Sequence, residues 1–159
     1  MEIKFKPIGI IHSPYTKLHD MPIQPSAASG VKGRVEVDEK YLPALSDLEG
    51  FSHIYLLYHF HLAKSYQLKV IPFLDDQERG LFATRAPKRP NPIGLSVVKL
   101  IRVEGHILHV ENIDIINGTP LLDIKPYIRE MEAAKDIHIG WLEKHASKID
   151  SQLSDKRFR

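Results

Sequence analysis

Apolar and polar residues alternate with a period of two in several short stretches, the pattern of β-strands that bury one face. The clearest stretch is 51–62, where an apolar face opposes a histidine-rich one, namely Ile54, Leu56, Tyr58, Phe60 and Leu62 against His53, His59 and His61. The same pattern predicts strands at 3–12, 33–37, 68–73, 95–103, 107–113 and 121–124, with a hairpin turn at Glu104-Gly105. Many short strands separated by turns are typical of a closed or nearly closed β-barrel.

Two stretches have helical spacing instead. Leucines and a tyrosine predict a short helix at 41–48, which tolerates Pro43 only in its first turn. Near the C-terminus an apolar stripe predicts an amphipathic α-helix, through Leu142, Ala146, Ile149 and Leu153. We therefore expect an all-β protein, a small single-sheet β-barrel with a short helix and a C-terminal α-helix. The barrel domain is expected at residues 1–130. A helical extension is expected at 131–159, packing on the barrel or on a partner subunit in a homodimer.

The stretch 80–96 combines three cations with three closely spaced prolines, namely Arg85, Lys88 and Arg89 with Pro87, Pro90 and Pro92. Each proline fixes its own φ and pushes the preceding residue toward extended geometry, so this loop is stiff and non-helical. The prolines alone would suit a loop that protects a sheet edge. The cations beside them favour a preformed binding site for an anion.

Composition narrows the function classes. With 159 residues, 43% of them hydrophobic, the chain is long enough for one globular domain with a true core. A net charge of +2 does not mark a nucleic-acid binder by itself. The lack of cysteine excludes disulfides, thiolate metal sites and a cysteine nucleophile. The charged N-terminus and the lack of an apolar stretch of about 18 residues predict a soluble, cytoplasmic protein without a membrane span.

Other local patterns leave alternatives open. His53, His59 and His61 could hold a metal, but a polar or water-lined strand face is the more frequent meaning of such histidines. Asp114 and Asp123 flank a glycine turn at 117–120 and suit either general-base chemistry or turn capping. The dinucleotide and P-loop glycine motifs and the nucleophile elbow are absent. An enzyme of this sequence would work by positioning and electrostatics.

Five segments, in order along the chain, carry a resemblance to a known family. They are F-K-P-I-G-I-I-H-S-P-Y (5–15), P-I-Q-P (22–25), G-F-S-H-I-Y-L-L-Y-H-F-H (50–61), G-L-F-A-T-R-A-P-K-R-P-N-P-I-G-L-S (80–96) and N-G-T-P-L-L-D-I-K-P-Y (117–127). The sequence resembles the TsaA-like family of β-barrel, S-adenosylmethionine-dependent tRNA methyltransferases. The resemblance implies a barrel that dimerises and transfers a methyl group from S-adenosyl-L-methionine to N6 of threonylcarbamoyladenosine next to the tRNA anticodon.

The resemblance also implies site residues. The cofactor would be held by Gln24, Pro25, Ser26, His61, Leu62, Arg85, Leu95, Asn117, Gly118, Thr119 and Pro120. Lys88 and Arg89, together with Arg85, are the candidates for contacts with RNA phosphates, and no metal is implied. The residue that accepts the proton of the amine is open among Asp114, Asp123, His61 and Tyr127.

Three departures from the family pattern bear on function. The family usually has Asp at position 117 and Ser at position 86, where this chain has Asn117 and Ala86. Its better-studied bacterial members also carry a substantial C-terminal domain, whereas about thirty residues follow Tyr127 here. Two further hypotheses are therefore kept. One is a protein that binds S-adenosylmethionine or RNA without methyl transfer, and the other, more distant, is a metal enzyme built on the H-x-H strand.

Overall fold

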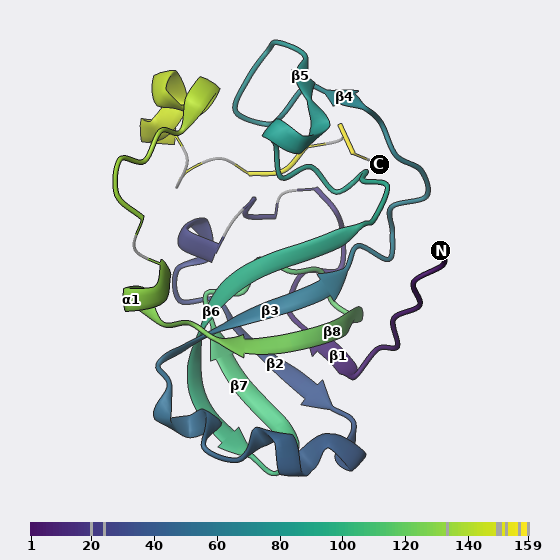
Figure 1. Cartoon of the computed structure of the whole chain (residues 1–159), viewed down its shortest axis with the longest axis vertical. Coiled ribbons are helices and arrows are strands. Elements are labelled where there is room, and N and C mark those ends of the chain that lie inside the picture. Colours follow the sequence, from purple (N-terminus) through teal and green to yellow (C-terminus); the bar gives the residue numbers. More distant parts are fainter. Residues whose placement is uncertain are drawn as a thin grey trace.

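Six short strands close into one barrel in the order β1-β2-β7-β6-β3-β8, with every neighbouring pair antiparallel. The structure is a computed structural model that describes residues 1–19, 21–23, 25–132, 134–148, 151, 153–155 and 157–158. Figure 1 shows the barrel and, beyond one of its ends, a lobe that carries the two-stranded sheet β4-β5. The predicted all-β barrel is confirmed.

The elements have the following bounds. The barrel strands are β1 (Gly9–His12), β2 (Lys32–Val37), β3 (His53–His59), β6 (Ile93–Glu104), β7 (Ile107–Glu111) and β8 (Thr119–Pro126). The small sheet pairs β4 (Lys69–Val70) with β5 (Arg79–Gly80). Helical turns of the 3₁₀ type span Pro25–Ala28, Glu39–Leu45, Leu48–Gly50, Leu81–Ala83 and Gly140–Lys148, and the α-helix α1 spans Arg129–Glu132.

Strand β3 organises the barrel core. Ile54, Leu56 and Tyr58 are buried while their neighbours along the strand are only partly buried, as the period-two pattern predicts. The strand pairs with β6 on one side and with β8 on the other. The inward side chains of all six strands form a single core cluster. Each fully buried aliphatic side chain contributes about 1.5–3 kcal/mol of transfer free energy, so this shared core stabilises the closed sheet.

Four predicted strands are shorter than their patterns suggest. The stretch 68–73 forms only β4, Lys69–Val70, and the stretch 107–113 forms β7, Ile107–Glu111. Strand β1 begins only at Gly9, and Ile3 and Phe5 remain 69% and 66% exposed. The reason is that its partner β2 ends at Val37, after which the chain turns into the 3₁₀ helix Glu39–Leu45. An apolar stretch forms a strand only as far as a neighbour supplies hydrogen bonds. In the same way β3 ends at His59 rather than at residue 62.

The two predicted helices differ from the structure more than the predicted strands do. The helix predicted at 41–48 is a 3₁₀ helix, Glu39–Leu45, with Pro43 inside it. The predicted C-terminal α-helix is a 3₁₀ helix limited to Gly140–Lys148. Asp136 and Gly140 have positive φ, which interrupts a right-handed helix before this point. Of the predicted stripe, Leu153 forms a β-bridge with Pro22, and Ile149 lies outside the described residues.

The division of the chain at residue 130 stays a prediction. In the part of the chain that the structure describes, the helices are too short or too polar to cross a membrane.

Gly9 offers a test of barrel closure. A Cβ atom at this position would collide with the backbone of β2, at the Glu36 carbonyl oxygen and Val37 Cα, so Gly9→Ala forces two paired strands apart. We expect the free energy of unfolding to fall by about 1–3 kcal/mol. Gly50→Ala is the matched control, because no atom lies within 4 Å of a Cβ placed there. Urea denaturation measures both, and equal stability of the two variants would contradict the packing of β1 on β2.

Candidate functional site

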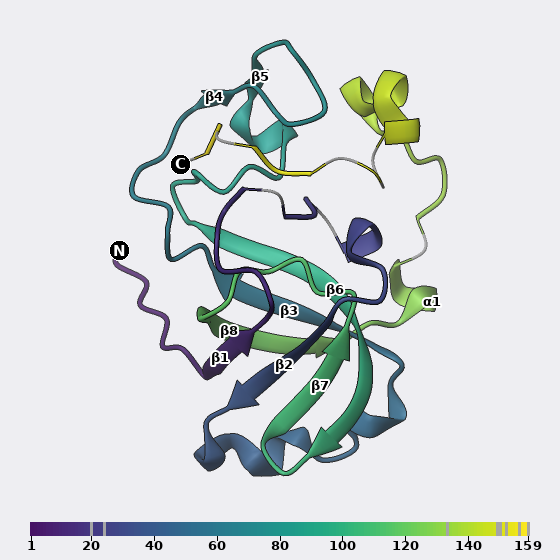
Figure 2. The same cartoon turned by 180° about the vertical axis from the view of Figure 1, so that it is seen from behind.

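A cavity of about 810 Å³ lies at the end of the barrel that the β4-β5 lobe overhangs. The barrel contributes the end of β3, the start of β6 and residues between Asp114 and Thr119 to its walls. The loop at 18–23, the lobe and C-terminal residues from Trp141 onward supply the rest. Figure 2 shows the lobe and the C-terminal residues beyond the same end of the barrel, whereas the 3₁₀ helices at 39–50 cover the other end. The cavity has the size of a small-molecule binding site.

The structure brings part of the predicted cofactor set together on this cavity, namely His61, Leu62, Arg85, Leu95 and Thr119. Four others, Ser26, Asn117, Gly118 and Pro120, are not among the residues that line it. Pro25 begins the 3₁₀ helix Pro25–Ala28, and Gln24 lies outside the described residues. Of the two predicted RNA contacts, Arg89 lines the cavity and Lys88 does not. The ligand roles of all these residues stay predictions.

The glycine turn at 117–120 is engaged by the fold. Gly118 has φ +81°, which explains why glycine is required there. Its N–H donates to the Ile11 carbonyl at 2.9 Å, and the Asn117 N–H donates to the Tyr15 carbonyl at 2.7 Å. The Asn117 side-chain oxygen accepts from the Ser13 N–H at 3.2 Å. These two backbone donors fasten the turn to Ile11 in β1 and to Tyr15 beyond it.

Two of the three cations of the proline loop, Arg85 and Arg89, line the cavity, and their surroundings differ. Arg89 donates to the carbonyl oxygens of Thr84 at 3.0 Å and Ala86 at 3.3 Å, and its guanidinium lies over the Phe82 ring. Arg89 thus pins the loop in its bent shape. The Arg85 side chain is exposed and has no hydrogen-bond or ion-pair partner among the residues that the structure describes. Arg85 is therefore the cation available to a ligand.

A buried hydrogen-bond chain ends on Asp114 at the cavity wall. The Ser96 hydroxyl donates to Asp114 Oδ1 at 2.7 Å, and the Tyr58 hydroxyl lies 3.0 Å from Ser96 Oγ. Because Ser96 has a single hydroxyl proton, Tyr58 donates to Ser96. Burial raises the pKa of Asp114 to about 6, while the Ser96 hydrogen bond and the Arg85 charge oppose that rise. Burial and the charge of Asp114 also raise the pKa of Tyr58, which keeps its proton.

Sequence reasoning missed Tyr58 and Ser96 as site residues. Ser96 is only 2% exposed and occupies an inward position of β6, between the buried Gly94 and Val98. A hydroxyl at an inward position of an apolar strand requires a buried partner, and so does the hydroxyl of an inward tyrosine. The need of these two hydroxyls for a buried partner was the signal in the sequence that could have identified Tyr58 and Ser96.

His61 contributes a nitrogen without a partner to the wall. Its Nδ1 atom is buried and makes no hydrogen bond within the described part of the chain. Burial lowers the pKa of His61, so the ring is neutral near pH 7 and this nitrogen is free to interact with a ligand. Because β3 ends at His59, His61 is not on the strand face of His53 and His59. No three His, Asp or Glu residues in the described part lie close enough to hold a metal ion.

Two of the four candidate proton acceptors line the cavity and two do not. Asp114 and His61 lie on its wall. Asp123 is 45% exposed and pairs with Lys125 at 2.9 Å, and Tyr127 packs against the rings of His53 and Tyr55. Neither Asp123 nor Tyr127 is among the residues that line the cavity.

Comparison with known proteins gives consistent matches. The family model described as tRNA-methyltransferase O N-terminal domain matches residues 10–133. A probable S-adenosyl-L-methionine-binding protein from Pyrococcus abyssi is 51% identical over 156 residues, which cover 98% of this chain and 85% of that protein. The human tRNA (adenine(37)-N6)-methyltransferase is 36% identical over 139 residues, covering 83% of this chain but 32% of the human protein.

A solved structure agrees with these relatives. The crystal structure of TrmO from Pseudomonas aeruginosa superposes with a TM-score of 0.75 at 38% sequence identity, over 89% of this chain and 63% of that one. The chain thus spans less than two thirds of that structure. The match to the family model covers most of the barrel, including the proline loop, Asp114 and the glycine turn. The chain belongs to the tRNA-methyltransferase O N-terminal domain family.

Proposed function

We propose that this protein is an S-adenosyl-L-methionine-dependent methyltransferase that modifies N6 of threonylcarbamoyladenosine next to the anticodon of tRNA. The proposal is supported by the family match and by the activity for which the human relative is named. The observation that carries it is the cavity at the barrel end, where an oriented carboxylate, an unpartnered imidazole nitrogen and an available arginine meet apolar walls.

The residues present fit the cofactor. Leu62 and Leu95 offer apolar surface for its adenine and methionine chain, and both are partly exposed at the cavity. The His61 Nδ1 atom offers a hydrogen-bonding nitrogen, and Arg85 offers a cation for the carboxylate of the methionine part. When bound, S-adenosyl-L-methionine supplies a methyl group activated by its sulfonium.

Asp114 is the proposed proton acceptor. An exocyclic amine conjugated to a purine ring is a weak nucleophile, so the loss of its proton must accompany formation of the new bond. The proton passes from N6 to a carboxylate oxygen of Asp114. Ser96 and Tyr58 fix the orientation of that carboxylate through their hydrogen-bond chain. The target base must leave its stack to enter the cavity.

Lys88 and Arg89 stay proposed contacts to tRNA phosphates, beside the loop-pinning role of Arg89. We also propose a cytoplasmic homodimer. Its support is the exposed apolar side chains on the outside of the barrel and away from the cavity, among them Ile10 on β1 and Ile101 on β6.

Binding of the cofactor without catalysis is the second candidate function, because the Pyrococcus relative is named for binding alone. One experiment separates the two. The protein is incubated with S-adenosyl-L-methionine and tRNA that carries threonylcarbamoyladenosine at position 37, and the nucleosides are analysed by mass spectrometry. A mass increase of one methyl group on that nucleoside supports the enzyme. An unmodified nucleoside, with calorimetry showing that the cofactor binds, supports the binding protein.

Replacement of the carboxylate tests the proton acceptor. Asp114→Asn keeps an oxygen that accepts from Ser96 but removes the basic site, so we expect kcat to fall by about 10²-fold or more. Asp123→Asn is the control, because Asp123 lies away from the cavity and pairs with Lys125. Steady-state methylation rates measure both variants. An equal loss in the two, or no loss in Asp114→Asn, would exclude Asp114 as the acceptor.

The raised pKa of Asp114 predicts a pH dependence with a defined sign. Only the ionised carboxylate accepts a proton, so kcat should rise with pH up to about 6 and then level off, and Asp114→Asn should lack this rise. Stability should change in the opposite direction. The folded state holds the proton more tightly than the unfolded state, whose ordinary pKa is 3.8, so ionisation of Asp114 costs up to about 3 kcal/mol between pH 4 and 7. Chemical denaturation at both pH values measures this as the difference between wild type and Asp114→Asn.

Replacement of Arg85 should lower cofactor affinity, whereas replacement of Arg89 should lower the stability of the fold. Arg85→Ala removes an exposed side chain, so we expect cofactor affinity to fall by about 1.5–3 kcal/mol while the unfolding midpoint stays unchanged. Arg89→Ala removes the bonds to Thr84 and Ala86, so we expect a lower unfolding midpoint. Calorimetry with S-adenosylhomocysteine and thermal denaturation measure the two effects. Unchanged affinity in Arg85→Ala would move this arginine to the RNA side of the site.

A further inference from the structure

Part of the cavity wall lies outside the family domain. The family model ends at residue 133, yet Trp141, Leu142, Ser154, Asp155 and Phe158 all line the cavity. The C-terminal segment that carries them lies beyond the end of the barrel, next to the lobe (Figure 2). The C-terminal segment therefore belongs to the site, and its contacts show what it does there.

Ser154 fastens the segment to the loop at 18–23. Its N–H donates to the Met21 carbonyl at 2.7 Å, and its hydroxyl accepts from the Met21 N–H at 2.9 Å. The same hydroxyl donates to the Leu18 carbonyl at 2.9 Å. Leu153 and Pro22 form a β-bridge beside it. A segment from the C-terminus thus pairs like a strand with the loop that precedes the predicted cofactor residues 24–26.

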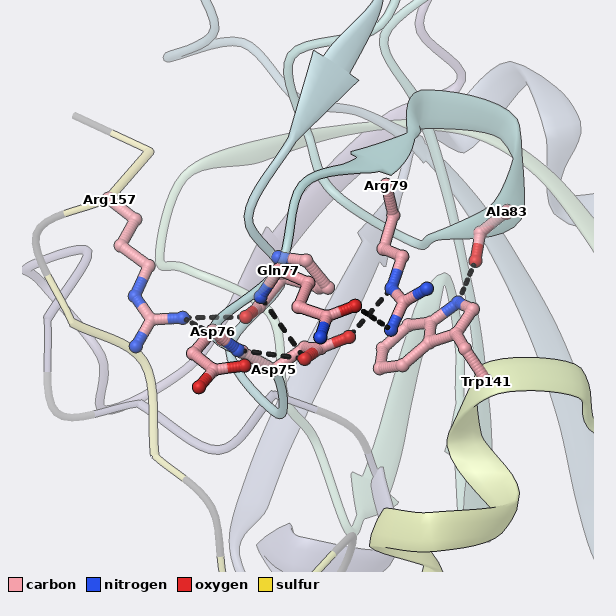
Figure 3. Close-up of polar contacts among 8 residues, drawn as sticks. Asp75, Asp76, Gln77, Arg79, Ala83, Trp141 and Arg157 are labelled. Atoms are coloured by element: carbon pink, nitrogen blue, oxygen red, sulfur yellow. Dashed lines mark hydrogen bonds and ion pairs between the residues drawn. The ribbon is translucent and has the colours of Figure 1, made fainter.

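Arg157 and Phe158 fasten the same segment to the lobe. Arg157 Nη1 donates to the carbonyl oxygens of Pro72 at 2.6 Å and Asp75 at 3.2 Å. Figure 3 shows Arg157 reaching the turn at Asp75. The Phe158 ring meets Phe73 edge-on at 5.0 Å and packs against the buried cluster of Val70, Leu81 and Ala86.

Trp141 makes a second attachment to the lobe, close to Arg85. Its Nε1–H donates to the Ala83 carbonyl at 2.8 Å, two residues before Arg85. The Arg79 guanidinium lies 5.6 Å from the centre of its ring and is held at 2.7 Å by the buried carboxylate of Asp75 (Figure 3). Asp75 therefore connects both attachments, because its side chain holds Arg79 and its carbonyl oxygen accepts from Arg157.

We propose that Trp141, Ser154, Arg157 and Phe158 together form a brace that holds the loop at 18–23 and the Arg85-bearing lobe as two walls of the cofactor cavity. Ser154, Arg157 and Trp141 are positioning residues in this arrangement. Loops that are ordered before a ligand arrives lose less conformational entropy on binding, so the brace increases affinity through preorganisation. The proposal rests on the proposed function in one respect, the identity of the ligand.

The two anchors of the brace can be removed separately in the 159-residue chain. Ser154→Ala removes two hydrogen bonds to the loop at 18–23, and Arg157→Ala removes two bonds to the lobe. Ser151→Ala is the matched control, because the exposed Ser151 hydroxyl donates only to the nearby Lys148 carbonyl. Amide hydrogen exchange in the ligand-free protein is measured in the peptides covering 18–23 and 72–85.

A brace transmits the loss of one anchor to the other wall. Ser154→Ala should raise exchange in 72–85, which Ser154 does not bond, and Arg157→Ala should raise exchange in 18–23. Ser151→Ala should change neither. Exchange raised only beside the mutated anchor would overturn the brace, whatever ligand the cavity takes.

Binding decides whether the brace serves the cofactor. By calorimetry, Ser154→Ala and Arg157→Ala should weaken S-adenosylhomocysteine binding about tenfold relative to wild type and Ser151→Ala. kcat at saturating cofactor should be retained, because Asp114 and its partners lie on the barrel. Wild-type affinity in both anchor variants would overturn the role in cofactor binding. A wild-type protein that binds no S-adenosylhomocysteine would instead contradict the proposed function, and the exchange result would still stand.

Discussion

Closure of the barrel is the constraint on which the other features depend. In a six-stranded sheet whose first and last strands pair, every strand has two neighbours, and the inward side chains fill the interior. Closure pairs the first strand of the sheet with the last, which leaves little edge for strand addition. Because the interior is filled, the ends of the barrel are where a cavity can form. One end is covered by the 3₁₀ helices at 39–50, and the cavity occupies the other.

The interior determines the chemistry available at that end. Tyr58 and Ser96 are inward residues of the paired strands β3 and β6, so their hydroxyls lie where only a protein partner can satisfy them. Asp114, in the segment that follows β7, accepts the hydrogen bond of the Ser96 hydroxyl. Ionising a carboxylate in this place costs free energy because the surroundings solvate the charge poorly. The barrel core stabilises the fold enough to offset this cost. The result is a carboxylate base whose pKa is raised to about 6.

The sequence predicted the parts of this arrangement that depend on local pattern. The alternation of Ile54, Leu56 and Tyr58 correctly predicted an inward face, and Gly118 correctly predicted a turn with positive φ. The prolines predicted a non-helical cationic loop at 80–96, which is correct except for the 3₁₀ helix Leu81–Ala83. Its Arg85 and Arg89 line the cavity, and the binding of an anion there stays a prediction. Each of these follows from steric rules that act within a few residues.

Features that depend on distant partners were not predictable. The pairing of β3 with β8 shifts register between Leu57 and Tyr58, and the alternation within either strand cannot show such a bulge. Ser96 and Asp114 meet although eighteen residues separate them. The apolar stripe near the C-terminus predicted a helix, but Leu153 forms a β-bridge with Pro22 and stays 47% exposed. The spacing of apolar residues is a weak local signal, and contacts with distant segments decide which structure forms.

The substitution at position 86 illustrates how the lobe and the C-terminal segment depend on each other. Ala86 is 7% exposed and packs with Val70 and Leu81 against Phe158. A serine hydroxyl at this position would enter an apolar cluster and would need a new hydrogen-bond partner. Alanine instead gives the Phe158 ring a uniformly apolar surface. Ala86, which departs from the usual family pattern, therefore belongs to the apolar cluster on which Phe158, a residue beyond the family domain, packs.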